Sequence, residues 1–299
     1  MVRSMTYSIV ARDPLTGELG VAVQSHWFSV GSVVSWAQPG VGAVATQANA
    51  EVSYGPQALE LLAAGRSPQE ALDELIAADP GSDGRQVAVL AADGRVAAHT
   101  GSLAVAFAGH VTGDGFSCQA NIMANDTVWP AMKQAFETAE GPLAERLMVT
   151  LEAAEAAGGD IRGRQSAAIL VVPAEGEPWR TTVSLRVEDD PEPLVEMRRL
   201  LAIHGAYAIA TEGDDAVNEG RFDDAARLFG EAHALVPDSH ELLFWSGLGR
   251  AQGGDVEGGA EQVRAAIELQ PGWGTLLERL PADVAPSAAA VREALARPV

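Results

Sequence analysis

Residues 6–25 read Thr-Tyr-Ser-Ile-Val-Ala-Arg-Asp-Pro-Leu-Thr-Gly-Glu-Leu-Gly-Val-Ala-Val-Gln-Ser. Two runs rich in apolar and β-branched residues flank a turn that contains Asp13, Pro14 and Gly17. Such runs on either side of a proline- and glycine-containing turn are typical of a β-hairpin. The stretch therefore predicts a pair of strands at the start of the fold, and the interpretation of the rest of the chain depends on its first residue.

Thr6 follows Met5, which is a second possible initiator methionine. Initiator methionine is normally removed ahead of a small residue, and Thr6 would then carry its hydroxyl beside a free α-amine. That is the arrangement of a nucleophile that supplies its own base. Met1–Ser4 is too short for a signal peptide or a membrane span. The alternative is that Met1–Met5 is a retained tail and that Thr6 is an ordinary strand residue.

Composition narrows the class of protein. The chain has 299 residues, of which 47% are hydrophobic, and this is enough for one large domain and a small one. A net charge of −21 argues against nucleic acid or an anionic membrane as a partner. The single cysteine, Cys118, cannot form an internal disulfide, and no Cys/His cluster has zinc spacing. We expect a cytoplasmic protein with neither a metal nor an organic cofactor.

The remaining patterns predict strands, two helices, strands, two helices and strands. Helices are expected from Tyr54, from Pro68, over 128–139 and over 142–157, with Ser67 and Glu70 forming a capping box. Further strands are expected over 28–37, 40–47, 86–90, 96–99, 104–107, 116–122, 166–172 and 181–187. This order predicts an α+β fold in four layers, αββα, with two facing sheets between helices. The domain would cover 6–190 and a linker helix 191–205.

Residues 206–299 contain an internal repeat. Five pairs of residues recur 34 positions apart: Gly213 and Gly247, Gly220 and Gly254, Ala226 and Ala260, Ala232 and Ala266, and Pro237 and Pro271. This is the period of tetratricopeptide repeats, which are pairs of packed helices. We therefore expect an all-α, tetratricopeptide-like region that docks on the main domain or pairs with another subunit.

Polar residues at strand ends are the candidate site residues, because buried polar groups need hydrogen-bond partners or a function. Gln47 and Asn121 are candidate donors to an oxyanion, with Asn49 nearby. Asp160 and Arg162 could orient the nucleophile or form a structural ion pair. The other candidates lie at two strand ends and either serve the reaction or stabilise loops: Ser25, His26, Gln165 and Ser166.

The chain resembles the bacterial family called domain of unknown function 1028. The resemblance covers residues 5–204 and rests on residues 6–25, Gly40–Gln47, Tyr54–Pro56, Arg85–Val89, His99–Gly101, Gly158–Ala168 and Leu185–Pro193. It implies the four-layer fold of N-terminal nucleophile (Ntn) hydrolases, with Thr6 at the nucleophile position. Asp160 and Ser166 lie in the segment that supports the terminal amine in some members. The only lysine, Lys133, falls in a predicted helix, so a lysine on an early strand is absent.

The leading hypothesis is an amidohydrolase in which Thr6 attacks a small amide or a short peptide. One alternative is a catalytically silent binding protein that contacts protein or cell-wall fragments through its repeats. Another is a hydrolase that uses His26 or His99 with an internal serine, whose rate would titrate near neutral pH. We also expect a homo-oligomer, and Cys118 is interpreted as a small core residue.

Overall fold

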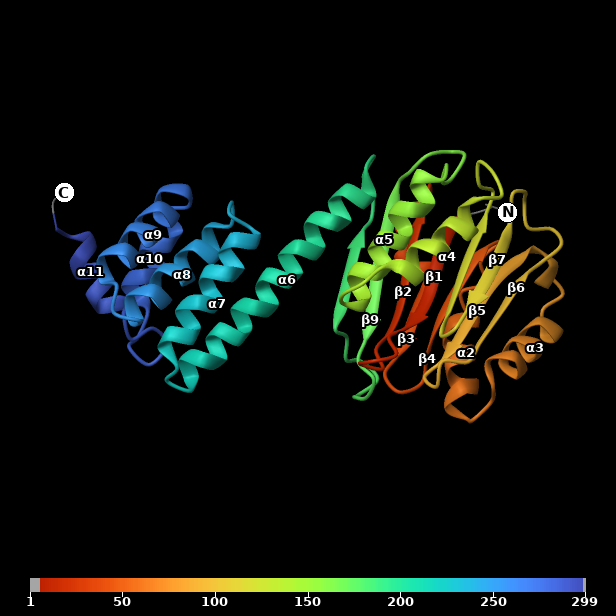
Figure 1. Cartoon of the computed structure of the whole chain (residues 1–299), viewed down its shortest axis with the longest axis horizontal. Helices are drawn as coiled ribbons and strands as arrows, with labels where there is room; N and C mark the ends of the chain where they lie inside the picture. The colour runs from red at the N-terminus through yellow and green to blue at the C-terminus, as the bar shows by residue number, and fades with distance from the viewer. Residues whose placement is uncertain (1–5, 298–299) are drawn as a thin grey trace. The chain divides into compact units, whose positions relative to one another are not determined.

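The computed structural model of the chain describes residues 6–297 and contains two compact units, one up to residue 199 and one from residue 200 (Figure 1). The first unit is mixed α+β with two antiparallel sheets, and the second is helical. The predicted α+β class with an all-helical C-terminal region is therefore confirmed. Over 6–297, no helix is long and apolar enough to cross a membrane.

The larger sheet is built on the opening hairpin. Strands β1 (Thr6–Arg12) and β2 (Leu19–Ser25) are antiparallel, with Thr6 opposite Ser25, as the sequence predicts. Asp13 stabilises the turn by accepting hydrogen bonds from the backbone N–H groups of Leu15 and Thr16. The sheet has the order β10-β9-β2-β1-β8-β7, with β7 Gly109–Gly113, β8 Phe116–Asn121, β9 Ser166–Val172 and β10 Val183–Val187.

The second sheet has the order β3-β4-β5-β6 and packs face to face on the first. Its strands are β3 (Ser35–Gln38), β4 (Gly42–Ala48), β5 (Arg85–Ala91) and β6 (Val96–Thr100). Its outer face is covered by α2 (Tyr54–Ala63) and α3 (Pro68–Ala78), and α3 begins with the predicted capping box of Ser67 and Glu70. The outer face of the larger sheet is covered by α4 (Val128–Thr138) and α5 (Leu143–Ala156).

Two strand predictions are wrong. Part of the 28–37 segment forms a short helix, α1 (Gly31–Val34), because Val30 and Val34 turn into the core between the sheets, and only β3 continues as a strand. The 104–107 segment is a loop. The carbonyls of Val105 and Phe107 accept hydrogen bonds from the N–H groups of Ile122 and Met123, just beyond the end of β8.

The helical unit keeps the period seen in the sequence. Helix α6 spans Pro193–Asn218, and the unit continues with α7 (Phe222–Leu235), α8 (His240–Gln252), α9 (Val256–Leu269), α10 (Gly272–Arg279) and α11 (Ala288–Leu295). The bounds of α9 are those of α7 displaced by 34 residues, and α8 ends 34 residues after α6. The equivalent Gly220 and Gly254 both have positive φ, which glycine adopts without strain in the turn between two helices.

Replacing either of two glycines in these helices with alanine should change the free energy of unfolding in opposite directions. A Cβ on Gly247 would lie 2.7 Å from the carbonyl oxygen of Gly259, whereas a Cβ on Gly230 would meet nothing within 4 Å. We expect Gly247→Ala to lower the free energy of unfolding by about 1–3 kcal/mol through overpacking. Gly230→Ala should raise it by about 0.5–1 kcal/mol, because alanine loses less backbone entropy. Urea unfolding of the full chain, followed by far-UV circular dichroism, measures both; equal effects would contradict the close α8–α9 contact.

Candidate functional site

The layer between the two sheets changes from apolar to polar along the strands. At one end it is filled by Val10, Leu19, Val21, Leu90 and Val172. At the other end six of the strands (β1, β2, β4, β5, β8 and β9) present buried polar side chains to the same layer: Thr6, Ser8, Ser25, Gln47, Gln86, Gln119, Asn121 and Ser166. Polar groups are buried at a cost unless they are hydrogen-bonded. This polar layer, defined by those eight residues, is therefore the first place to look for function.

Four members of the polar layer form one row across the larger sheet. Strand register places Asn121 opposite Thr6, Thr6 opposite Ser25, and Ser25 opposite Ser166. The Thr6 hydroxyl donates to the Ser25 hydroxyl oxygen at 3.1 Å. The Ser166 hydroxyl donates to the Trp27 carbonyl and accepts from the Val30 N–H, so it stabilises the loop after β2. Thr6 and Ser25 are thus the hydroxyl pair of this row.

Two amide side chains hold the backbone of Thr6. Its carbonyl oxygen accepts from Gln47 Nε2 at 3.2 Å and from Asn121 Nδ2 at 3.3 Å. The same two nitrogens donate to Gln86 Oε1, at 2.7 Å and 3.0 Å. Gln47 Nε2 also lies 3.4 Å from the Gln119 carbonyl, so its two N–H groups are shared among three acceptors. In this arrangement both side chains contact the Thr6 backbone, and their role as oxyanion donors stays a prediction.

Sequence reasoning missed Gln86, which lies at the centre of this network. Its Oε1 accepts from the two amides, and its Nε2 donates to the Thr100 hydroxyl and to the carbonyls of Gly109 and Ala120. Ser8 was also missed, and it links Gln47 to Gln119. The sequence did contain a signal for Gln86. Side chains along a strand alternate between its two faces, and Gln86 shares one face of β5 with the buried Ala88 and Leu90.

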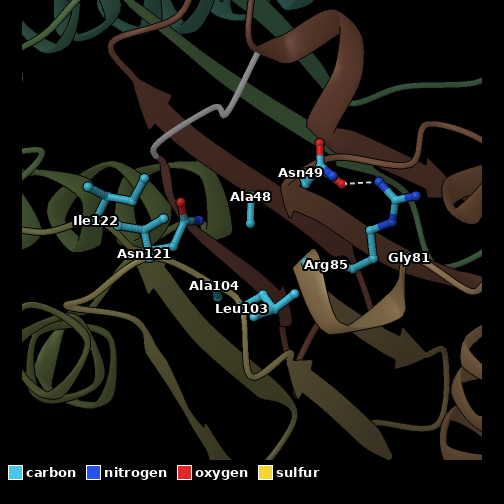
Figure 2. A pocket seen from close by; sticks show the side chains of 10 residues that line it. Ala48, Asn49, Gly81, Arg85, Leu103, Ala104, Asn121 and Ile122 are labelled. Carbon is cyan, nitrogen blue, oxygen red and sulfur yellow. Dashed lines mark hydrogen bonds between the residues drawn. The ribbon is translucent and has the colours of Figure 1, made fainter. Parts of the chain in front are cut away.

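A cavity of about 290 Å³ opens beside the row, and Figure 2 shows the Asn121 amide at its wall. It is lined by the ends of β4 and β8 and by loops, through Ala48, Asn49, Gly81, Gly84, Arg85, Leu103, Ala104, Val105, Asn121 and Ile122. Ala48 and Ile122 have φ of 67° and 56°. Such left-handed conformations are unusual for residues with a side chain and occur most often at functional sites.

Arg85 closes one side of this cavity without offering a free charge. Its guanidinium is 2.8 Å from Asp79 and 3.7 Å from Glu51, and it also donates to the Asn49 carbonyl (Figure 2). The hydrogen bond from Arg85 holds the pKa of Asp79 below its ordinary value, so the pair stays charged at neutral pH. Asn49 is a cavity residue here, and it does not belong to the row of Thr6.

The remaining candidates stabilise the segment before β9. Asp160 accepts from the backbone N–H groups of His26 and Arg162 and forms an ion pair with the Arg162 guanidinium at 3.1 Å, the structural alternative noted above. The ring of His26 lies 3.2 Å from the Arg164 carbonyl. The Gln165 side chain points to Asp189 and donates a hydrogen bond to it. Only the backbone N–H of Gln165 contacts the row, by donating to the Ser25 carbonyl. These residues thus contact the row through Ser25 and the loop after β2.

Three further residues noted in the sequence lie away from the row. Cys118 is buried on β8, where burial raises the pKa of its thiol well above the ordinary value, so it is a neutral core residue as expected. Lys133 lies on α4, where its Nζ is 3.6 Å from Oε1 of Glu137. The ring of His99 on β6 contacts the Ser82 carbonyl at 3.1 Å.

Within residues 6–297, no group of three or more His, Cys, Asp or Glu side chains could hold a metal ion. Met1–Met5, whose removal the sequence predicts, lie outside the described residues.

Comparison with known proteins identifies the family of the first unit. Residues 6–197 match the family of unknown function DUF1028. The crystal structure of SPO2555 from Silicibacter pomeroyi, also assigned to DUF1028, is similar to this chain, with 32% sequence identity and a TM-score of 0.61. The similarity covers 66% of this chain and 85% of the SPO2555 chain. Anbu (ancestral beta-subunit) from Yersinia bercovieri is 12% identical over 64% of this chain and 91% of the Anbu chain. Its TM-score of 0.34 is too low to indicate a shared fold. No curated protein matches. The chain belongs to the DUF1028 family.

Proposed function

We propose that the chain is an Ntn-type hydrolase that cleaves a small amide or a short peptide with Thr6 as its nucleophile. The observation that carries this proposal is the set of contacts on Thr6. Its hydroxyl is hydrogen-bonded to Ser25, and its carbonyl is held by Gln47 and Asn121 beside a cavity. The two facing sheets with helices on both outer faces are the arrangement expected of the Ntn fold.

The proposed reaction begins when removal of Met1–Met5 makes the Thr6 nitrogen a free amine. The Thr6 hydroxyl oxygen attacks the amide carbonyl carbon, and the α-amine accepts the hydroxyl proton. The proton then passes to the leaving nitrogen as the C–N bond breaks, which leaves an acyl ester on Thr6. Water attacks that ester and releases the carboxylic acid. Gln47 and Asn121 keep the threonine backbone in place during both steps.

The N-terminus tests this mechanism directly. Two untagged forms of the full chain are compared, one starting at Thr6 and one in which Met1–Met5 is retained, and intact mass spectrometry verifies each N-terminus. We expect amide hydrolysis by the form that starts at Thr6 and none by the extended form. In the extended form the Thr6 nitrogen belongs to a peptide bond, so it cannot act as the base. Equal activity of the two forms would contradict the mechanism and favour a histidine-dependent hydrolase.

We also propose that the helical unit is a tetratricopeptide-like module that contacts a protein partner. Its support is the 34-residue displacement between equivalent helices, with equivalent turn glycines and the buried Ala232 and Ala266 at equivalent positions. If neither form of the chain hydrolyses amides, this module and the family fold together favour the alternative of a catalytically silent binding protein.

A further inference from the structure

The helical unit contains a cavity of about 550 Å³, which is larger than the one beside Thr6. Helix α6 lines it from Tyr207 to Asn218, and α8 lines it through Glu241 and Trp245. A helix rises about 1.5 Å per residue, so the α6 wall is about 16 Å long. An extended chain of about five residues has that length. This cavity, the α6–α8 groove, therefore has the dimensions of a short peptide.

Aromatic side chains form part of the surface of the α6–α8 groove. Tyr207, Phe229 and Trp245 line it, one from each of α6, α7 and α8. The Phe229 ring is closely packed, because a Cβ on Gly213 or Gly249 would lie 3.0 Å or 2.6 Å from it. Tyr207 is 41% exposed, so a ligand can reach its ring. Aromatic faces attract cations, and a planar guanidinium group also stacks on them.

Three carboxylates line the same groove, and within residues 6–297 none of them forms an ion pair: Asp214, Glu241 and Asp283. The Tyr207 hydroxyl donates to Glu241, which places that carboxylate between α6 and α8. Asp214 and Asp283 are exposed, so a ligand can reach both side chains. Partial burial and the charge of Asp215 raise the pKa of Asp214, and no cation in residues 6–297 lowers it. The groove thus carries negative charge that the described chain does not neutralise.

The cations of the helical unit neutralise other acidic residues. Arg221 forms ion pairs with Glu219 and Asp224, and Arg250 forms one with Asp255. Among the described residues that line the groove, none is Lys or Arg. Unmatched acids beside aromatic rings are therefore a feature of the groove and are not typical of the whole unit.

From these contacts we infer that the α6–α8 groove binds an extended peptide segment of a partner protein, with an arginine that stacks on Trp245 and pairs with Asp214 and Glu241. This inference rests on the proposed contact of the helical unit with a protein partner, and it names the chemistry of that partner. Arginine fits better than lysine, because its planar group can stack on a ring and bond a carboxylate through two N–H groups. A peptide fits better than a free amine, because a single cation fills only part of the groove.

Matched ligands test the inference by binding to the full chain with Met1–Met5 retained. The probe is a capped pentapeptide, glycine-arginine-leucine-arginine-glycine, and its analogues carry lysine or the uncharged isostere citrulline in place of arginine. Agmatine supplies a free guanidinium group. Dissociation constants are measured by isothermal titration calorimetry at about 0.15 M salt, where distant charges are largely screened. The citrulline peptide and agmatine should each bind about tenfold or more weaker than the arginine peptide, and the lysine peptide severalfold weaker.

Paired substitutions locate the binding and remove the effect of net charge. Asp214→Asn with Glu241→Gln should weaken the arginine peptide about tenfold and leave the citrulline peptide unchanged. Glu261→Gln with Glu268→Gln, two acids of α9 outside the groove, makes the same change in net charge and should alter affinity less than about twofold. Trp245→Leu should remove most of the preference for arginine over lysine. If that variant does not fold, the wild-type series and the paired substitutions still decide.

The contrary outcomes differ in what they overturn. Equal affinity for the arginine and citrulline peptides, or equal weakening by the two paired substitutions, would overturn the inference. If the two peptides bind equally and Trp245→Leu weakens both, the proposed contact with a protein partner stands without the arginine. No binding of any peptide would overturn the inference and count against that contact as well. Agmatine that binds as tightly as the peptide would show a site for a small organic cation and would also overturn the inference.

Discussion

Replacing Thr6 with alanine is expected to lower amide turnover by roughly 10³-fold or more, the scale seen when a catalytic nucleophile is removed. The variant loses the hydroxyl that attacks the substrate, and it also loses a hydrogen bond to Ser25 that contributes about 1 kcal/mol to folding. The fold should therefore persist. The measurement is kcat for an amide cleaved by the chain that starts at residue 6, with circular dichroism to verify folding.

Two further variants show whether the loss belongs to the nucleophile. Thr6→Ser keeps the hydroxyl and should retain a measurable fraction of the turnover. Ser166→Ala removes a hydroxyl from the same row, but one that already bonds Trp27 and Val30, so its effect on turnover should be small. Wild-type turnover by Thr6→Ala would exclude the proposed mechanism, and an equal loss in Ser166→Ala would indicate a general disturbance of the row.

Replacing Gln86 with leucine should lower the free energy of unfolding by about 3–5 kcal/mol. The substitution removes the acceptor for Gln47 and Asn121 and the donor for the carbonyls of Gly109 and Ala120. Each buried group that loses its partner costs about 1–3 kcal/mol, partly offset where another partner remains. Urea unfolding measures the change. A loss below about 1 kcal/mol would show that the polar layer is not stabilised through Gln86.

Gln24→Leu is the matched control, because Gln24 is equally buried on a strand of the same unit. Neither its Oε1 nor its Nε2 has a hydrogen-bond partner within residues 6–297. Removing an amide that makes no bonds removes a desolvation cost, so the variant should be unchanged or more stable by up to about 2 kcal/mol. Equal destabilisation by both substitutions would mean that glutamine packing, and not hydrogen bonding, stabilises these positions.

Local signals in the sequence were sufficient for most of the regular elements. The turn at Asp13–Gly17, the capping box of Ser67 and Glu70, and the 34-residue period each act over a few residues or repeat regularly, and each is observed. The prediction failed for residues 28–37 and 104–107, where contacts with distant parts of the chain replace the β-ladder. Val30 and Val34 enter the core between the sheets, and the 104–107 loop bonds the residues after β8.

The site was predicted only in part, for a related reason. Strand ends in the sequence indicated Thr6, Ser25, Gln47 and Asn121, which the register and the hydrogen bonds bring together. The sequence left open whether Asp160 and Arg162 would orient the nucleophile or pair with each other, and whether Ser166 would serve the reaction or stabilise a loop; the structure shows the ion pair and the bond to the loop after β2. A polar residue at a strand end can turn to its neighbours or to the opposite sheet, and its spacing along the chain is the same in both cases.

The sequence by itself determined the opening hairpin, the order of strands and helices outside residues 28–37 and 104–113, the position of Thr6 at the start of β1, and the helical repeat, because these depend on short-range periodicity and turn chemistry. Only the tertiary structure decided that Gln86 links both sheets, that the amides of Gln47 and Asn121 hold the Thr6 carbonyl, and that Asn121 lines a cavity. The physical reason is that hydrogen-bond partners in a buried layer are chosen by register and by the packing of one sheet on the other.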